Sequence, residues 1–241
     1  MISIVIPTLN RGNFLPELVR TVKAAAVELG RPYEIIVVDD GSGDDTHRVL
    51  RQLCLIHREL RAVVLAGNSG QQNATLAGIR AARYPYVLTL DDDLEYDLGA
   101  LAPMVSALDQ GWDAVYVVGA STGASPFRRM GTAVKELLLV LLAGKPPELR
   151  LTSFRGLSGA SAAFVSGDTS RKVYLSARLL QYTRNILNLH SSRICPKGDS
   201  RYRPGGLVRL VWQIVRNYSP LAPWLKDLRP GEQYVIKELL P

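Results

Sequence analysis

The sequence IIVVDDGS at residues 35–42 indicates the fold class of this chain. Four β-branched apolar residues predict a short buried strand, and the two aspartates, the glycine and the serine after them predict a polar turn at its end. The same order recurs at residues 86–95, where YVLTL is followed by DDDLE. Both stretches therefore place carboxylates directly after a buried strand.

Around these two stretches, apolar strands and helical segments alternate through the first half of the chain. We expect strands at 3–6, 34–38, 61–65 and 86–90, and helices at 14–29, 46–60, 71–82 and 98–108. Such alternation requires right-handed crossovers and a mostly parallel sheet flanked by helices. Ligands bind beyond the carboxyl ends of the strands in such a sheet, so both acidic clusters should lie at one edge.

The pattern weakens after about residue 114. We expect an apolar helix at 132–143, a helix or a helix leading into a strand at 175–189, a basic loop at 192–206 and an amphipathic helix at 206–217. Residues 153–168 are rich in Gly, Ala and Ser and give no periodic pattern. We therefore divide the chain into an α/β domain at 1–205 and a helical and loop extension at 206–241.

The composition is typical of a folded protein with a basic surface. Apolar residues make up 47% and charged residues 21% of the 241 residues, and the net charge is +7. This excess suits phosphate-rich ligands or an anionic membrane surface. The two cysteines make neither a disulfide framework nor a zinc site. We find no signal peptide and no apolar run near the ~18 residues of a membrane span, so we expect a cytoplasmic protein, at most peripheral at the inner membrane face, with no nucleic-acid partner.

The acidic run DDDLE has the composition of a metal site. If the chain stays extended, Asp91, Asp93 and Glu95 project on one face, because strand side chains alternate. Three carboxylates suit a hard divalent cation, Mg²⁺ or Mn²⁺, which keeps its other positions for water and phosphate. Such a cation on a diphosphate would neutralise the charge of a nucleoside-diphosphate leaving group. The alternative interpretation is a solvated acidic turn.

The carboxylates of Asp39 and Asp40 stand where a nucleotide could bind. At a strand's end they can accept hydrogen bonds from a base or a ribose, and Gly41 allows the backbone to turn sharply. The stretch is not a Gly-x-Gly-x-x-Gly turn, which disfavours a dinucleotide. The alternative is an Asx-type turn before the helix that starts at Thr46.

Together, the motifs follow a known order. They are VIPTLN at 5–10, VVDDGS at 37–42, a Gly70-x-x-x-Ala74-x-x-x-Gly78 helix start and Asp91-x-Asp93. This order resembles that of the GT-A family 2 glycosyltransferases over at least residues 2–97. Further on, TSFR at 152–155 and GDSRY at 198–202 are similar to motifs of the polyprenyl-phosphate glycosyltransferases, of the dolichyl-phosphate mannose synthase and undecaprenyl-phosphate aminoarabinose transferase types.

The resemblance implies a GT-A, Rossmann-like fold and an inverting transfer from a UDP- or GDP-sugar, with the cation stabilising the leaving group. It implies a cation site at Asp91, Asp93 and Glu95. The implied nucleotide site comprises Pro7, Thr8, Asn10, Arg11, Asp39, Asp40, Gly70, Gln71, Asp91 and Asp92.

Two departures from the resembled family bear on the acceptor. The relatives carry a transmembrane hairpin, whereas this chain has none, and its residues 229–238 resemble the tail that follows the hairpin. The hairpin therefore looks excised between about residues 224 and 229. A Tyr-Ile-Asp segment of the bacterial relatives corresponds to Tyr174-Leu175-Ser176, which lacks the carboxylate.

Without the hairpin, we expect a soluble acceptor that carries a hydroxyl group. A hydroxyl must lose its proton as it attacks, so a carboxylate is needed, and Asp168 is the only acid between Glu148 and Asp199. The alternative acceptor is a polyprenyl phosphate, which is already anionic and needs cations instead of a base. The candidate catalytic and acceptor-binding residues for it are Arg128, Arg129, Arg155, Lys197, Ser200 and Arg201.

Two further alternatives remain open from the sequence. A nucleotide-sugar-binding protein that has lost catalysis would explain Ser176, although the intact Asp91-x-Asp93 disfavours it. The amphipathic helix at 206–217 could form a homodimer, pack on the domain or lie on a membrane surface.

Overall fold

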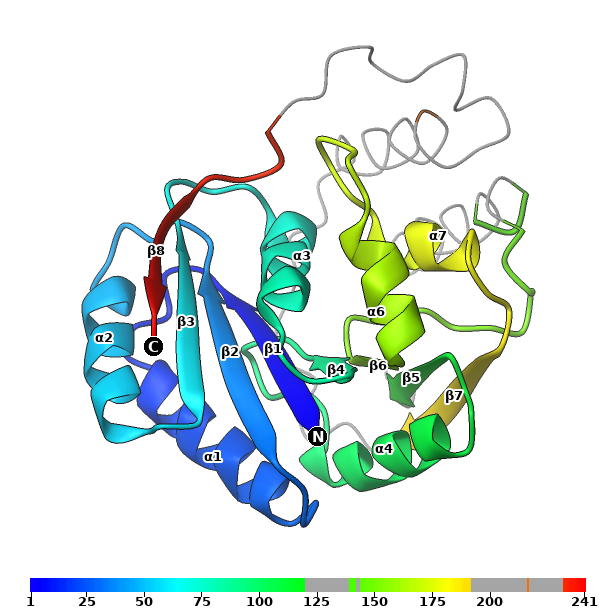
Figure 1. Cartoon of the computed structure of the whole chain (residues 1–241), viewed down its shortest axis with the longest axis horizontal. Helices are drawn as coiled ribbons and strands as arrows, with labels where there is room; N and C mark the ends of the chain where they lie inside the picture. Colours follow the sequence, from blue (N-terminus) through cyan, green and yellow to red (C-terminus); the bar gives the residue numbers. More distant parts are fainter. Residues whose placement is uncertain (120–138, 142–143, 192–215, 217–231) are drawn as a thin grey trace, which may run out of the picture.

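Eight strands form one mixed sheet in the computed structural model, which describes residues 1–119, 139–141, 144–191, 216 and 232–241 (Figure 1). They are β1 (Ile2–Thr8), β2 (Tyr33–Asp39), β3 (Leu60–Leu65), β4 (Tyr86–Thr89), β5 (Ala114–Gly119), β6 (Arg155–Leu157), β7 (Ile186–Ser191) and β8 (Ile236–Leu240). Their order across the sheet is β7-β5-β6-β4-β1-β2-β3-β8. Only β6 and β8 of these run antiparallel to their neighbours, so the predicted mostly parallel α/β fold is confirmed.

The middle of the sheet brings the ends of three strands together. All seven residues of β1 are buried, as expected of a strand covered on both faces. β1 pairs in parallel with β2, with Thr8 opposite Asp39, and on its other side with β4, with Val5 opposite Thr89. The segments that follow β1, β2 and β4 therefore meet at one edge, where the sequence predicted the two acidic clusters.

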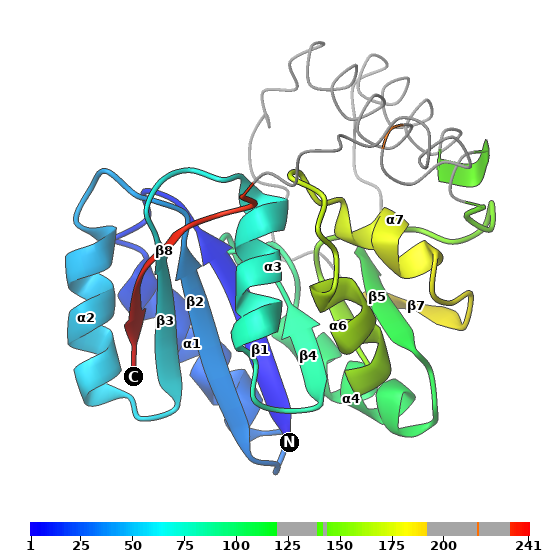
Figure 2. The same cartoon turned by 45° about the horizontal axis from the view of Figure 1, so that its top comes forward.

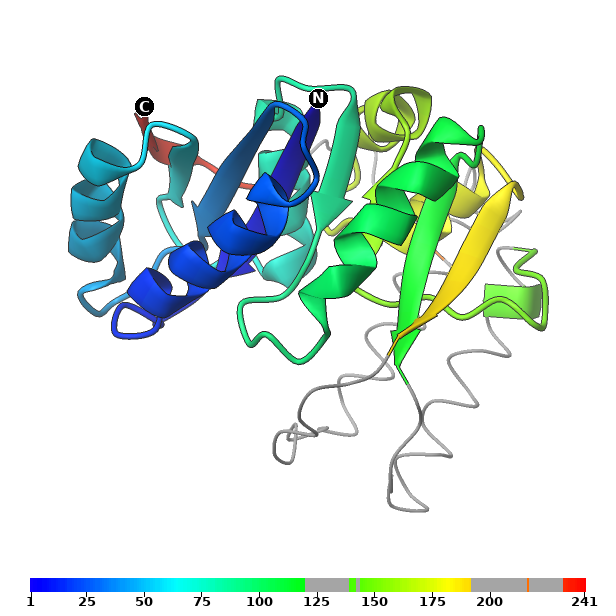
Figure 3. The same cartoon turned by 90° about the horizontal axis from the view of Figure 1, so that it is seen from below.

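Helices cover both faces of the sheet. On one face lie α1 (Leu15–Val27), α2 (Thr46–Ile56) and α4 (Leu101–Asp109), the last preceded by a 3-10 turn at Leu98–Ala100 (Figure 3). On the other face lie α3 (Gln71–Ala81), α6 (Gly159–Ser166) and α7 (Leu175–Leu180). Each helix buries an apolar stripe, so the sheet is the middle layer between two cores.

Helix α3 lies especially close to the sheet because of Gly78. A Cβ on Gly78 would stand 2.3 Å from Cγ1 of Val5 on β1 and 2.9 Å from Cγ2 of Val38 on β2. No side chain fits in that space. The small-residue motif that begins at Gly70 is thus explained by helix–sheet packing, and it sets the position of the first turn of α3 at the edge of the sheet.

The second half of the chain holds the elements that sequence patterns missed. The helix followed by a strand within 175–189 is confirmed as α7 and β7, but β5, β6, α6 and β8 were not predicted. β6 has only three residues, too few for a periodic pattern, and its Gly156 lies under Met104 of α4. β8 pairs antiparallel with β3, so residues 236–240 belong to the sheet of the α/β domain, which corrects the expected extension at its end.

Several expectations lie outside the described residues. These are most of the helix at 132–143, the loop at 192–206 and the helix at 206–217, together with Arg128, Arg129, Lys197, Ser200 and Arg201. Among the residues that the structure does describe, no helix is both long enough and apolar enough to cross a membrane.

Candidate active site

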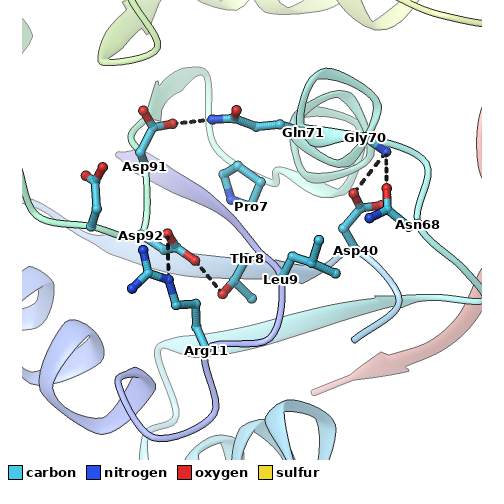
Figure 4. Close-up of a pocket in the computed structure, with 11 residues that line it drawn as sticks. Pro7, Thr8, Leu9, Arg11, Asp40, Asn68, Gly70, Gln71, Asp91 and Asp92 are labelled. Atoms are coloured by element: carbon cyan, nitrogen blue, oxygen red, sulfur yellow. Dashed lines mark hydrogen bonds and ion pairs between the residues drawn. The ribbon is translucent and has the colours of Figure 1, made fainter. Parts of the chain in front are cut away.

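A pocket of about 540 Å³ opens at the carboxyl edge of β1, β2 and β4 (Figure 4). Its lining combines carboxylates, amides and one guanidinium, with few apolar groups. The lining residues are Pro7, Thr8, Leu9, Arg11, Asp40, Asn68, Gly70, Gln71, Asp91, Asp92 and Asp93. Eight of the ten residues predicted to hold a nucleotide are among them, and the exceptions are Asn10 and Asp39. The pocket has the volume of an ordinary small-molecule site.

The segment after β1 forms one wall of the pocket and anchors the carboxylate of Asp92. Thr8 donates from Oγ1 to Oδ2 of Asp92 over 2.7 Å, and Nε of Arg11 lies 3.7 Å from Oδ1 (Figure 4). Burial raises the pKa of Asp92, and the hydrogen bond from Thr8 and the charge of Arg11 oppose that rise. Asp92 is thus committed to protein partners at the pocket wall.

Asn10 acts outside the pocket, on the turn that carries it. Its φ of 55° is in the left-handed region, which asparagine tolerates better than most residues. Its backbone N–H donates to Oγ of Ser42, and its side-chain oxygen accepts from the N–H of Gly43. Asn10 therefore joins the turn after β1 to the turn after β2.

Asp40 holds two loops together at the end of β2. Its two oxygens accept hydrogen bonds from the backbone N–H groups of Ser69, at 2.7 Å, and Gly70, at 2.9 Å. Burial raises the pKa of Asp40, and these two donors oppose the rise. The loops touch backbone to backbone, because a Cβ on Gly41, whose φ is 72°, would lie 2.5 Å from Gly67.

The two adjacent aspartates after β2 have different environments. Asp39 is 1% exposed, lies behind the pocket wall and accepts from the N–H of Ser42 at 2.9 Å. This bond closes the turn after β2, but it reaches three residues on and does not cap the helix from Thr46, so it is not the Asx-type turn that the sequence left as an alternative. Asp40 faces the pocket while it also holds the loop before α3.

Asp91 is oriented from two sides. Gln71, in the first turn of α3, donates its amide to Oδ1, and Ser153 donates its hydroxyl to Oδ2. Burial raises the pKa of Asp91, the hydrogen bond from Ser153 opposes the rise, and the nearby charge of Asp93 adds to it. Ser153 was not among the predicted site residues, although the TSFR motif contained it.

The extended backbone assumed for the predicted cation site at Asp91, Asp93 and Glu95 is wrong. β4 ends at Thr89, Leu94 has a φ of 53°, and the N–H of Glu95 turns back to Oδ1 of Asp93. The chain is therefore not extended, and Glu95 does not line the pocket. Among the described residues, no three His, Cys, Asp or Glu side chains converge as metal ligands.

The residues that do line the pocket still fit a divalent cation. Asp91 and Asp93 offer oxygen ligands, and Mg²⁺ typically takes one or two carboxylates and fills its remaining positions with water and phosphate. Mutual repulsion between Asp91 and its acidic neighbours contributes to the raised pKa of Asp91. A bound cation would relieve that repulsion, so Asp91 and Asp93 are the residues that would hold it.

Arg155 lies behind this acidic group, inside the protein. It is 3% exposed, donates from Nε to Thr89 and from Nη1 to Ser176, and its guanidinium lies 5.8 Å from the ring centre of Tyr116. Its positive charge lowers the pKa of Asp91, against the larger effect of burial. The charge of Arg155 thus acts on Asp91, although Arg155 does not line the pocket.

Asp168, the predicted base, is not brought to the pocket. It is 4% exposed at the end of α6, where Oδ1 accepts from the N–H of Ser170 and Oδ2 lies 4.0 Å from Nε of Arg178. No lining residue is among these partners. The other lining residues that the sequence did not single out, Leu9 and Asn68, lie in the turns after β1 and β3.

A comparison with known protein families identifies the family of the chain. The sequence profile described as Glycosyl transferase family 2 matches residues 3–161, which include β1 to β6 and the whole pocket. This chain belongs to glycosyl transferase family 2. The resemblance expected from the four motifs is thereby confirmed.

Curated relatives are about one third identical to this chain over the aligned residues. The undecaprenyl-phosphate 4-deoxy-4-formamido-L-arabinose transferase of Klebsiella pneumoniae subsp. pneumoniae is 36% identical over 218 residues, covering 89% of this chain and 66% of the relative. The enzyme of the same name from Pseudomonas savastanoi pv. phaseolicola is 32% identical over 220 residues, covering 89% and 64%. The chain therefore matches only about two thirds of the length of these relatives.

Solved structures share the fold at lower identity. Glucosyl-3-phosphoglycerate synthase from Mycobacterium tuberculosis, in complex with Mn²⁺, UDP-glucose and phosphoglyceric acid, superposes with a TM-score of 0.64 at 20% identity, covering 95% of this chain and 81% of that chain. TarS 1–349 of S. aureus, in complex with UDP-GlcNAc, superposes with a TM-score of 0.57 at 16% identity, covering 90% and 67%. The predicted GT-A fold is confirmed.

Proposed function

We propose that this family 2 member is a glycosyltransferase that moves a sugar from a nucleoside-diphosphate sugar to the phosphate of a polyprenyl carrier, with the help of a divalent cation. The proposal rests on one observation: the pocket gathers Asp40, Asp91 and Asp93 at the carboxyl edge of three adjacent strands. Relatives with 36% and 32% identity that are named for an undecaprenyl-phosphate acceptor support the acceptor class.

Different walls of the pocket would bind different parts of the donor. Asp40 and the turn after β1 would hold the nucleoside, and Asp91 and Asp93 would face the diphosphate through the cation. When bound, the cation supplies positive charge to the leaving diphosphate. Gln71 and Ser153 hold Asp91, and Thr8 and Arg11 hold Asp92, so these carboxylates need little rearrangement when the donor arrives.

The transfer itself would be a direct displacement at the anomeric carbon. An oxygen of the acceptor phosphate forms the new bond to that carbon, the bond to the diphosphate oxygen breaks, and its electron pair leaves with the nucleoside diphosphate. The configuration inverts. A phosphate acceptor is already ionised, so the step needs no base. This is consistent with Asp168 lying outside the pocket lining.

The charge distribution supports an anionic acceptor. Lys and Arg equal Asp and Glu in number over the described residues, so the whole excess of positive charge falls in 120–138, 192–215 and 217–231. These stretches contain the predicted acceptor-binding residues Arg128, Arg129, Lys197 and Arg201, which we propose bind the acceptor phosphate together with Ser200. Clustered cations raise the local concentration of an anionic substrate.

A hydroxyl-bearing soluble acceptor is the competing proposal. It needs a carboxylate that takes the proton of the hydroxyl. The pocket's own carboxylates are already engaged with backbone amides, with Gln71 and Ser153, with Thr8 and Arg11, or with the proposed cation, and Asp168 lies elsewhere. The structure therefore favours the phosphate acceptor over the hydroxyl acceptor.

Calorimetry followed by product analysis tests the proposal. UDP and GDP are titrated with and without Mn²⁺, and the better-bound nucleotide selects the donor sugars to be tried with a polyprenyl phosphate and with a panel of soluble sugars. We expect Mn²⁺ to tighten nucleotide binding and transfer to occur to the lipid phosphate. Nucleotide binding that ignores Mn²⁺ would contradict the cation site, and transfer to soluble sugars alone would contradict the acceptor.

A further inference from the structure

The C-terminal segment is attached to the domain by a dense set of hydrogen bonds around Gln233. Its side-chain amide donates to the carbonyl oxygens of Asp168 and Ser170, both at 2.8 Å, and its Oε1 accepts from Arg80 at 2.7 Å. Arg80 also reaches the hydroxyl of Tyr234 and the carbonyl of Asp168. This half-buried glutamine therefore links the C-terminal segment, α3 and the loop after α6.

Asn73 continues this network into the first turn of α3. It is 4% exposed, and its Nδ2 donates to the carbonyls of Gln233, at 2.9 Å, and Arg171, at 3.0 Å. Its Oδ1 accepts from the N–H of Val173 at 3.1 Å. Both donors of this amide are used and its oxygen accepts one hydrogen bond, so Asn73 ties the first turn of α3 to two other segments.

The same helical turn reaches the pocket. Gln71, two residues before Asn73, lines the pocket and donates to Asp91. Gln72, between them, accepts from the N–H of Leu175, next to the Ser176 that receives a hydrogen bond from Arg155. Figure 2 shows the C-terminal segment passing the first turn of α3 before it descends as β8 beside β3.

We propose that Gln233 is a positioning residue for the donor site. Its side-chain amide fixes the C-terminal segment, and the backbone carbonyl of the same residue then accepts from Asn73 and holds the first turn of α3, and with it the amide of Gln71 on Asp91. Gln233 is not among the residues that line the pocket. The inference rests on the proposed function, because Asp91 is taken to face the diphosphate through the cation. Residues far apart in the sequence, 71–73 and 233, thereby act on one carboxylate.

The expected effect follows from the hydrogen bonds that are lost. Gln233→Ala removes three side-chain hydrogen bonds and keeps the backbone carbonyl that accepts from Asn73, so that carbonyl is held less firmly. A cost of about 1 kcal/mol to nucleotide binding corresponds to roughly fivefold weaker affinity. Gln233→Glu keeps the shape and the acceptor for Arg80 but loses both donated bonds. Lys237→Ala is the matched control, because Lys237 is exposed on β8 in the same segment.

The test measures the dissociation constant of the better-bound nucleoside diphosphate with Mn²⁺ by calorimetry. We expect about fivefold weaker binding for Gln233→Ala and Gln233→Glu, and unchanged binding for Lys237→Ala. A double-mutant cycle with Gln71→Ala separates positioning from general stability, because Gln233→Ala should add nothing once Gln71 is gone. Hydrogen exchange of the amides at 71–75 should be faster in Gln233→Ala even without nucleotide.

Each contrary result would overturn the inference. Unchanged affinity in both Gln233 variants, fully additive effects in the cycle, or unchanged hydrogen exchange at 71–75 would show that Gln233 serves the tail alone. If Gln233→Ala does not fold, the isosteric Gln233→Glu decides by the same three measurements. A wild-type protein that binds neither UDP nor GDP would instead overturn the proposed function, and this inference with it.

Discussion

The pocket edge and the C-terminal attachment hold their polar groups in different ways. At the pocket, carboxylates from three strand ends accept hydrogen bonds from adjacent loops, and burial raises the pKa of Asp40, Asp91 and Asp92. Around Gln233, neutral amides are paired with backbone carbonyls. Burial and mutual repulsion disfavour the ionised carboxylates at the pocket, and a bound cation would relieve that repulsion. The side-chain amide donors of Gln233 and Asn73 already have acceptors.

This contrast separates the groups that would bind a ligand from the groups that hold the pocket in place. Buried carboxylates that repel each other destabilise the protein, so their presence in one pocket indicates a ligand that compensates them. The amide network around Gln233 needs no ligand to compensate it, since the side-chain donors of Gln233 and Asn73 already have acceptors. Substitutions at the pocket should therefore change binding and catalysis, and substitutions around α3 should change stability or the geometry of the pocket.

The largest effect should come from removing a cation ligand. Asp93→Ala should lower kcat/KM for sugar transfer by on the order of 100-fold or more and should abolish the effect of Mn²⁺ on nucleotide binding. Asp45→Asn is the control, because Asp45 is an exposed carboxylate that pairs with Arg48 and does not line the pocket. Retained Mn²⁺ dependence in Asp93→Ala would remove the basis for the cation site.

A large effect on stability should come from the closest contact between α3 and the sheet. Gly78→Ala introduces a Cβ only 2.3 Å from Cγ1 of Val5, and overpacking of this kind costs about 1–3 kcal/mol. Gly43→Ala serves as the control, since nothing lies within 4 Å of its Cβ position. Urea denaturation of both variants measures the difference, and equal midpoints would show that the helix can shift at no cost.

The pH dependence of binding should reflect the buried carboxylates. Burial raises the pKa of Asp91 above its ordinary 3.8, and the cation needs the ionised form. Mn²⁺-dependent nucleotide binding should therefore disappear, as pH falls, at a higher pH than an exposed aspartate would give. Without the cation, protonation of Asp91 favours the folded state, so its contribution to stability rises as pH falls between the raised and the ordinary value.

Calorimetry and thermal unfolding between about pH 4 and 7 check both parts of this prediction. Asp91→Asn should remove the pH dependence of the Mn²⁺ effect together with the effect itself. A midpoint for loss of binding at or below the ordinary pKa of aspartate would contradict the raised pKa of Asp91.

The smallest effect should come from Asp168, which does not line the pocket. With a phosphate acceptor no base is required, so Asp168→Asn should leave the transfer rate within about threefold of wild type, although it weakens the contact with Arg178. Initial-rate kinetics with the polyprenyl phosphate measure this. A loss as large as that of Asp93→Ala would show that Asp168 reaches the reacting atoms.

The sequence alone determined the α/β core and most of the pocket. Parallel strands flanked by helices are apolar along their length, and their carboxyl ends must meet at one edge, so IIVVDDGS and LTLDDDLE could be placed together without coordinates. Eight of the predicted nucleotide-binding residues line the pocket for this reason. Such signals are local, since each strand and its turn are adjacent in the chain.

Only the tertiary structure decided which of these carboxylates face the pocket and what supports them. The left-handed backbone at Leu94 leaves Glu95 outside the pocket lining. Asp39 and Asp40 are both buried, but only Asp40 is among the residues that line the pocket. Asp168 and Gln233 are joined across 65 positions of sequence by contacts that no periodicity encodes. Hydrogen bonds between distant segments depend on how whole elements pack, and a short strand or a single amide leaves no pattern that predicts its partner.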